Sequence, residues 1–149
     1  MTIVLDFDGT CVANEYPRVG PEIGATKILK ELVANGHQLV LFTMRSNRRT
    51  FLSNLLNWHS KEDDCLTEAV NWFSERKIPL YGIQKDPNQK TWVDSPKLKG
   101  ELIIDDSALG CPLVYPLGKG RCRPYVDWQK VRDNLVRLGV LPENEQSFC

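Results

Sequence analysis

The stretch IVLDFDGTCV, residues 3–12, runs from an apolar segment into two carboxylates and then into a glycine and a hydroxyl. Residues 2–5 are β-branched or leucine, which is typical of a short buried strand. A second stretch, ELIIDD at residues 101–106, repeats the pattern, because its apolar residues also run into paired acids. The sequence therefore predicts two strands that each end in acidic side chains.

The rest of the chain alternates helical and extended patterns. Apolar residues at helical spacing predict helices within residues 21–36, 47–59, 63–77 and 126–139. Short apolar runs predict further strands at residues 38–42, 79–83 and 112–117. This alternation favours an α/β fold, with a doubly wound, Rossmann-like, mainly parallel sheet and helices on both faces. We predict one domain at residues 1–139 and a loosely held C-terminal tail at residues 140–149.

Composition excludes several classes of function. The 149 residues suit one domain, and their formal net charge of zero gives no basic footprint for nucleic acid or membranes. No apolar run approaches the roughly 20 residues of a membrane span, and the N-terminal apolar run ends in acids, unlike a signal peptide. The five cysteines are scattered without a Cys-x-x-Cys pair, which disfavours a zinc site. We expect a cytoplasmic protein with reduced thiols.

Acids and a hydroxyl follow three predicted strands at the point where each ends. Asp6 and Asp8, Thr43, and Asp105 and Asp106 occupy these positions. In an open parallel sheet, ligands bind beyond the carboxyl ends of the strands, so we expect these groups to converge. On a continuing strand, Asp6 and Asp8 would also point to the same side.

A crevice holding three or four carboxylates is stable only with a cation, and oxygen ligands of this kind suit Mg²⁺. The predicted metal ligands are Asp6, Asp8, Asp105 and Asp106. Gly9 allows close backbone approach, and we expect its N–H to face an anion. The ordinary alternative is that each acidic pair merely caps a helix, but this would require coincidence at three strand ends.

Three motifs in this order resemble those of the haloacid dehalogenase superfamily. DFDGT at residues 6–10 is similar to the first motif, LVLFT at 39–43 to the second, and LIIDD at 102–106 to the fourth. The resemblance spans residues 3–107. The opening DFDGT…YPR.G.EI and the later KLK…IDD are similar to small capless phosphatase-like proteins of bacteria and their phages.

The resemblance implies a role for each matching residue. Asp6 would be the nucleophile that forms an aspartyl-phosphate, and Asp8 the general acid and base, with its backbone carbonyl on Mg²⁺. Asp106 would bind the metal directly, and Asp105 would bind through water or steady the loop. The implied substrate-binding residues are Gly9, Thr10, Thr43, Met44, Arg45 and Lys97.

The phosphate-binding lysine of the third motif is left open among three candidates. Lys97, eight places before Asp105, is preferred to Lys99, and Lys90 requires the 84–100 segment to fold inward. Arg45, two places after Thr43, is either a contact for a substrate anion or a surface residue. The loop containing Arg18 corresponds to the family's mobile flap. No insertion there is large enough for a cap domain.

The resemblance implies a Mg²⁺-dependent phosphohydrolase that cleaves a phosphomonoester, most simply a small molecule. The alternatives are a receiver-like phosphoacceptor module, a non-catalytic binding protein and a phosphatase of nucleic-acid 3′ ends. Receivers place their acidic pair first and their lysine last, unlike this chain. A non-catalytic protein would be expected to lack Asp6 or Asp8, and the neutral charge gives nucleic-acid ends no support.

Overall fold

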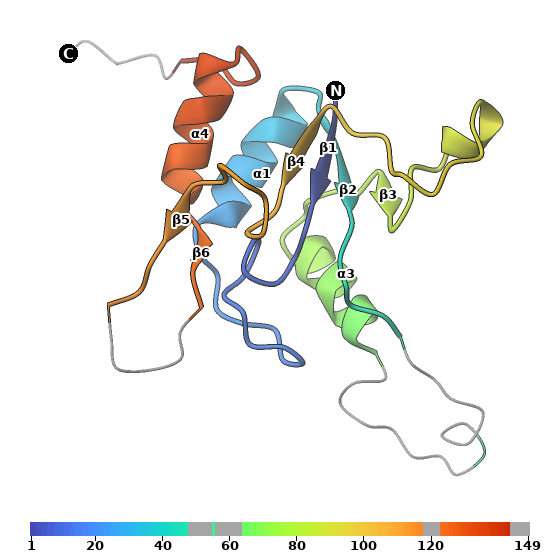
Figure 1. The fold of residues 1–149 in the computed structure, drawn as a ribbon, viewed down its shortest axis with the longest axis horizontal. Coiled ribbons are helices and arrows are strands. Elements are labelled where there is room, and N and C mark those ends of the chain that lie inside the picture. Colours follow the sequence, from blue (N-terminus) through green and yellow to red (C-terminus); the bar gives the residue numbers. More distant parts are fainter. Residues whose placement is uncertain (48–54, 56–63, 118–122, 144–149) are drawn as a thin grey trace.

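The computed structural model describes residues 1–47, 55, 64–117 and 123–143. Its centre is a parallel sheet of β1 (Thr2–Leu5), β2 (Gln38–Leu41), β3 (Gly82–Ile83) and β4 (Leu102–Ile104), in the order β3-β2-β1-β4. Leu5 pairs with Ile104, so β1 and β4 end side by side at one edge of the sheet (Figure 1). The predicted α/β, Rossmann-like, mainly parallel fold is confirmed.

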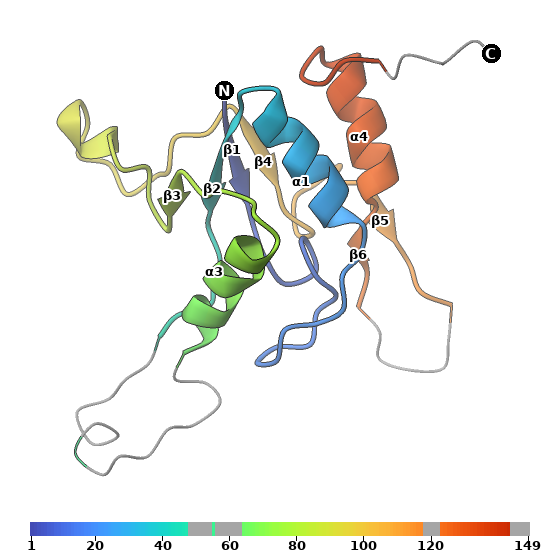
Figure 2. The ribbon, with the colours of Figure 1, turned by 180° about the vertical axis from the view of Figure 1, so that it is seen from behind.

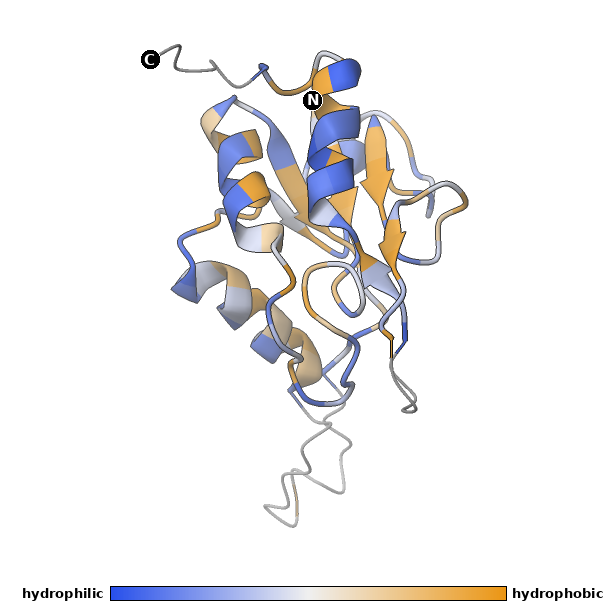
Figure 3. Cartoon of the chain, turned by 90° about the vertical axis from the view of Figure 1, so that its left-hand side faces the viewer, coloured by the Kyte–Doolittle hydropathy of each residue, from blue (hydrophilic) through white to orange (hydrophobic). Residues whose placement is uncertain are grey.

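Three α-helices are described: α1 (Ala25–Ala34), α3 (Cys65–Glu75) and α4 (Trp128–Arg137). Leu29, Phe73 and Leu135, one from each helix, belong to the same buried cluster as Ile3 and Leu5 of the sheet. Figure 2 shows α1 and α3 on the same side of the strands, with α4 beside α1. Figure 3 shows hydrophobic residues concentrated in the strands, whereas the helices carry both hydrophilic and hydrophobic residues. Apolar burial against one face therefore stabilises the arrangement.

The prediction of helices on both faces is not met in the described residues. The strand order reverses direction after β3, as in a doubly wound sheet, but the connection to β4 contains only a short 3-10 helix, η1 (Gln89–Thr91). At the end of this connection, a Cβ on Gly100 would clash with Val4 Cγ2. Val4 is not in the buried cluster that the helices share with Ile3 and Leu5, so the connection lies against the other face of the sheet. Its two prolines, Pro87 and Pro96, and its polar composition explain the lack of an α-helix.

A hairpin that the sequence pattern did not indicate lies beside the sheet. β5 (Leu113–Val114) pairs antiparallel with β6 (Tyr125–Val126). Val126 N donates to Gly9 O at 2.8 Å, which ties the hairpin to the loop after β1. The strand predicted at residues 112–117 is thus shorter than expected, because the hairpin uses only two of its residues.

The expected domain boundary at residue 139 is wrong. Val140 and Leu141 are 8% and 3% exposed, and the Val140 carbonyl oxygen lies 2.8 Å from His37 Nε2. The packed chain therefore continues past Gly139. Most of the helix predicted at residues 47–59, the basic stretch 118–122 and the terminal residues 144–149 lie outside the described residues. None of the described helices has the length and apolar character needed to cross a membrane.

Candidate active site

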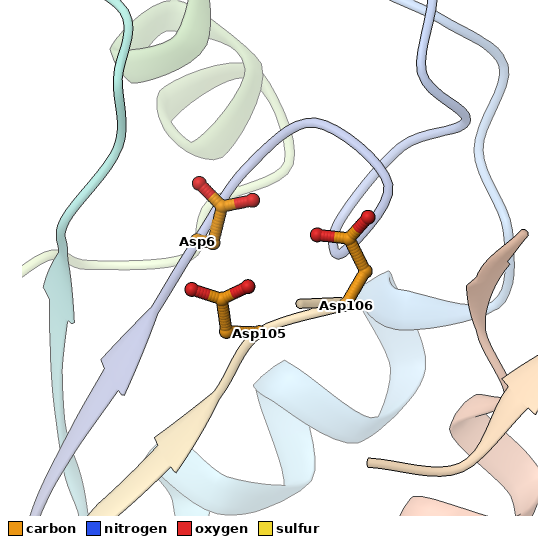
Figure 4. A group of neighbouring side chains, drawn as sticks. All are labelled: Asp6, Asp105 and Asp106. Carbon is orange, nitrogen blue, oxygen red and sulfur yellow. The ribbon is translucent and has the colours of Figure 1, made fainter. Parts of the chain in front are cut away.

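Three carboxylates from distant parts of the sequence meet beyond the ends of β1 and β4. Asp6 follows β1, and Asp105 and Asp106 follow β4. One carboxylate oxygen from each lies within 4.8 Å of the other two. Figure 4 shows the three side chains standing together at this edge. The parallel pairing of two adjacent strands thus brings together the acids of two predicted motifs, here called the acid cluster.

The acid cluster is electrostatically unfavourable when fully ionised. Burial raises the pKa of Asp6 from 3.8 to about 6; a Phe7 backbone hydrogen bond opposes the rise, and the charges of Asp105 and Asp106 add to it. Burial and the charge of Asp105 also raise the pKa of Asp106, partly offset by the positive charge of Arg123. A bound cation would relieve this repulsion.

Thr10 holds the loop after β1 against the loop after β4. Its hydroxyl lies 3.4 Å from Asp6 Oδ2, to which it donates, and accepts from Asp106 N at 3.0 Å. Its carbonyl accepts from the buried indole of Trp128 at 2.7 Å. Thr10 therefore joins the two loops, and its predicted contact with substrate stays a prediction. Trp128 was not selected from the sequence, because nothing in its helical spacing distinguishes it from a core residue.

Gly9 approaches the acid cluster, but not through a free N–H. A Cβ at this position would lie 2.5 Å from Asp106 Oδ2, and the residue has a φ of +81°. Its N–H donates to Val12 O at 2.7 Å. The expectation that this N–H faces an anion is therefore wrong for this conformation, because the turn after β1 uses it internally.

The carboxylate of Asp8 is not part of the acid cluster, contrary to the prediction. Its Oδ2 and Oδ1 accept from Nε and Nη2 of Arg45 at 2.7 and 2.8 Å. β1 ends at Leu5, so the side alternation of a strand does not extend to Asp8. Among the described residues, the carboxylates that lie within 4.8 Å of one another are those of Asp6, Asp105 and Asp106, and Asp8 is not one of them. The carboxylate of Asp8 is therefore not placed as a metal ligand.

Arg45 is neither a surface residue nor a contact for a substrate anion in this conformation. Its side chain is fully buried. Burial opposes its charge, but hydrogen bonding to Asp8 and the charge of Asp8 outweigh this, and the pKa of Arg45 is raised. The interpretation of Arg45 as a surface residue is wrong, because Asp8 supplies the carboxylate that allows a cation to be buried. Contact with a substrate anion stays a prediction, and it would require Arg45 to give up one of these hydrogen bonds.

The loop after β2 is held by a residue that the sequence reasoning missed. Gln84, which follows β3, accepts from Thr43 N at 2.9 Å and donates to the carbonyls of Thr43 and Arg45 at 2.7 and 3.0 Å. Thr43 Oγ1 accepts from Arg45 N at 3.2 Å, and Met44 is 98% exposed. The N–H groups of Thr43 and Arg45 are thus used within the protein. A polar residue directly after a predicted strand was the available signal for Gln84.

None of the three candidate lysines reaches the acid cluster. Lys97 is exposed, and its carbonyl accepts from Gln89 Nε2 at 2.7 Å, while Lys99 Nζ lies 5.5 Å from the ring centroid of Trp92. Lys90 is exposed in η1, which lies out beyond β3 (Figure 1). Lys97 and Lys99 precede the amino end of β4, whereas the acids follow its carboxyl end. The assignment of Lys97 is therefore not met, because the 84–100 segment folds on Gln89.

A cavity of about 640 Å³ lies between the chain segment 17–22 and α3. It is lined by residues 17–22 and by side chains of α3 that include Glu68 and Trp72. None of the acid cluster lines this cavity. The acids instead stand beyond the carboxyl ends of the strands (Figure 4), which is the edge where open parallel sheets bind ligands.

The donor set of the acid cluster fits a small hard cation. Three carboxylates supply oxygen atoms, which Mg²⁺ prefers, and Mg²⁺ needs few protein ligands because it keeps several waters. Asp105 Oδ1 also accepts from Ser107 N at 2.8 Å, which fixes the turn after β4. Asp6 and Asp106 would then hold the cation directly, and Asp105 directly or through water.

No protein-family model matches the chain, and no curated protein matches it. A solved structure does: a conserved protein of Bacteroides thetaiotaomicron is 31% identical, with a TM-score of 0.64, over 93% of this chain and 91% of that one. Identity at this level over nearly the whole of both chains goes beyond a shared fold. The chain belongs to the same family as this conserved bacterial protein.

Proposed function

We propose that this protein is a Mg²⁺-dependent phosphohydrolase of the haloacid dehalogenase type that cleaves a phosphomonoester through an aspartyl-phosphate on Asp6. The observation that carries the proposal is the meeting of Asp6, Asp105 and Asp106 within 4.8 Å. These acids come from the two motifs, nearly a hundred residues apart, that resemble those of such enzymes. Their order on the chain and their place at the carboxyl edge of a parallel sheet support the same reading.

The first half-reaction transfers the phosphoryl group to the protein. A carboxylate oxygen of Asp6 attacks phosphorus, the ester P–O bond breaks, and its electron pair leaves with the alcohol oxygen. Asp8 gives a proton to that oxygen. Mg²⁺, when bound by the acid cluster, offsets charge on the phosphoryl oxygens.

The second half-reaction releases phosphate. Water gives a proton to Asp8 as its oxygen attacks phosphorus, and the bond to Asp6 breaks, which restores both carboxyl groups for the next cycle. Thr10 keeps Asp6 and Asp106 at a fixed separation in both half-reactions. Its hydroxyl donates to the Asp6 carboxylate and accepts from the backbone N–H of Asp106. Asp8 must turn its carboxyl toward the reacting oxygen for these proton transfers.

A phosphoacceptor module is the second candidate, and the pairing of Asp8 with Arg45 favours it. Both oxygens of Asp8 accept hydrogen bonds at 2.7 and 2.8 Å. If Asp8 stayed in this position, Asp6 could be phosphorylated but the acyl phosphate would lack a base to activate water. Such a protein would accept one phosphoryl group and turn over slowly.

The test is hydrolysis of p-nitrophenyl phosphate by the purified full chain, with Mg²⁺ and with EDTA. We expect multiple turnovers with Mg²⁺, none with EDTA, and none in Asp6→Asn, whose amide has the same shape but is a poor nucleophile. Asp133→Asn, on the exposed part of α4, is the control and should keep full activity. Equal rates with and without EDTA would contradict the metal assignment.

Mass spectrometry separates the two candidates. A single phosphoryl group retained on the peptide containing Asp6, without turnover, would favour the phosphoacceptor module. A panel of phosphorylated metabolites and 3′-phosphorylated oligonucleotides then identifies the substrate class. We expect metabolites to be preferred, since the chain has no net positive charge.

A further inference from the structure

The guanidinium of Arg45 is fully enclosed and fully hydrogen-bonded. The side chain has 0% exposure. A guanidinium carries five N–H groups, and here they donate to five oxygens. Two of these are the carboxylate oxygens of Asp8, and the others are the carbonyls of Pro17, Arg18 and Cys65. Arg45 thus has no donor left for a substrate.

Two aromatic rings complete the enclosure. The guanidinium carbon lies 5.0 Å from the ring centroid of Phe7 and 5.4 Å from that of Tyr16. Phe7 belongs to the loop that carries Asp6 and Asp8, whereas Tyr16 belongs to loop 13–21, which projects beyond the carboxyl ends of the strands (Figure 1). Arg45 is therefore the point where these two loops and the start of α3 meet.

We propose that Arg45 is a positioning residue that fixes the carboxylate of Asp8 and makes its orientation depend on loop 13–21. This inference rests on the proposed function, in which Asp8 is the general acid and base. Nη2 of Arg45 donates both to Asp8 Oδ1 at 2.8 Å and to Arg18 O at 2.7 Å. One nitrogen thus joins the candidate acid and base to the loop.

The coupling follows from the cost of an unpaired buried donor. If loop 13–21 moves away, the carbonyls of Pro17 and Arg18 leave two N–H groups of a buried cation without partners. The guanidinium must then shift, and Asp8 shifts with it.

A kinetic experiment tests the positioning role. Arg45→Lys keeps the charge but cannot hold a carboxylate with two parallel hydrogen bonds. We expect kcat for p-nitrophenyl phosphate to fall about 10- to 100-fold, as for other residues that orient a catalytic group, with KM within about twofold. A change in the pH dependence of kcat should accompany this fall.

The matched control is Arg132→Lys. Arg132 holds Glu31 with the same bidentate geometry, at 2.9 and 2.6 Å, between α1 and α4. Its side chain is 10% exposed, and neither residue of the pair belongs to the acid cluster. This variant should keep kcat and its pH dependence. A raised KM with unchanged kcat in Arg45→Lys would overturn the proposal, because that result indicates substrate contact.

Hydrogen exchange tests the coupling without any activity. Within loop 13–21, Ala13 N donates to Pro21 O at 2.9 Å and Arg18 N to Glu15 O at 3.0 Å. We expect both amides to exchange faster in Arg45→Lys, and also in Asp8→Asn, whose amide nitrogen places a donor against the donors of Arg45. They should be unchanged in Arg132→Lys.

The kinetic and the hydrogen-exchange measurements distinguish failure of the proposed function from failure of the coupling. If the wild-type protein hydrolyses no phosphomonoester, the proposed function fails, while faster exchange in Asp8→Asn still supports the link between Asp8 and the loop. If Arg45→Lys does not fold, Asp8→Asn decides alone. Unchanged exchange in a folded Asp8→Asn variant would overturn the coupling.

Discussion

Gly9 and Asp106 approach each other so closely that no side chain fits between them. A Cβ on Gly9 would lie 2.5 Å from Asp106 Oδ2 and 2.8 Å from its carboxyl carbon. This contact joins the loop after β1 to the loop after β4. It therefore helps to set the spacing of the acid cluster, and it makes Gly9 a test of that spacing.

Gly9→Ala should lower both stability and, on the proposed function, activity. The φ of +81° alone costs an L-residue about 1–2 kcal/mol, and the clash with Asp106 adds to this. Gly36→Ala is the matched control, because Gly36 has a φ of +80° and nothing within 4 Å of the added Cβ. Urea unfolding should show a larger loss in Gly9→Ala, and equal losses would mean that Asp106 simply moves aside.

Asp6→Asn should stabilise the metal-free protein at neutral pH and, on the proposed function, remove activity. Because burial raises the pKa of Asp6 to about 6, against 3.8 for the exposed group, the native state keeps a proton that the unfolded state has lost between these values. This contribution to stability is full below pH 3.8 and disappears as the pH rises through about 6. The wild-type protein should therefore lose up to about 3 kcal/mol relative to Asp6→Asn between about pH 4 and 7.

Chemical unfolding of both proteins in EDTA across this pH range measures the difference. Added Mg²⁺ should then stabilise the wild-type protein at pH 7, because binding to the native state favours folding. The difference in unfolding free energy between the wild-type protein and Asp6→Asn should therefore become smaller. Asp133→Asn controls for the loss of a carboxylate as such. A gap that does not change with pH would show that the Asp6 carboxyl is not destabilised by its surroundings.

Thr10→Val should be more harmful than Thr10→Ser. Thr10 is completely buried, and its hydroxyl is the partner of Asp106 N. Valine has the same shape but leaves this N–H unpaired, which costs about 1–3 kcal/mol, whereas serine keeps the hydroxyl and loses one methyl group. Unfolding free energies of the two variants check this, and a serine variant as unstable as the valine variant would assign the role to the methyl group instead.

The sequence located the acid cluster because strand polarity is a strong constraint. Apolar runs ending in Asp6 and in Asp105 predict convergence once the strands are parallel and adjacent, and their pairing through Leu5 and Ile104 meets that condition. The same logic failed for Asp8, because the strand ends at Leu5 and the following turn redirects the side chain. Periodicity arguments are valid only within an element, so they do not place a residue three positions beyond it.

The remaining errors concern side chains that satisfy distant backbone groups. One interpretation of Arg45 placed it at the surface, although its partners include carbonyls 27 and 28 residues away. Gln89 binds the carbonyls of Ser95 and Lys97, and this keeps Lys97 away from the acids. Such contacts depend on how loops fold over each other, and neither hydrophobic pattern nor motif spacing encodes them.

Gln84→Glu should disturb the loop after β2 more than Gln84→Ala does. Both substitutions remove the donor to the carbonyls of Thr43 and Arg45, each within 3.0 Å, at a cost of about 1–3 kcal/mol. A glutamate also places a negative charge against these carbonyl oxygens, although it still accepts from Thr43 N. The extra loss should shrink as the pH falls below about 4.5, where a glutamate takes up a proton and becomes a donor again. Unfolding of both variants at pH 7 and pH 4 measures this, with Gln38→Glu on the exposed start of β2 as the control. If the difference between the Glu and Ala variants is the same at both pH values, the charge of the glutamate does not act on these carbonyl oxygens.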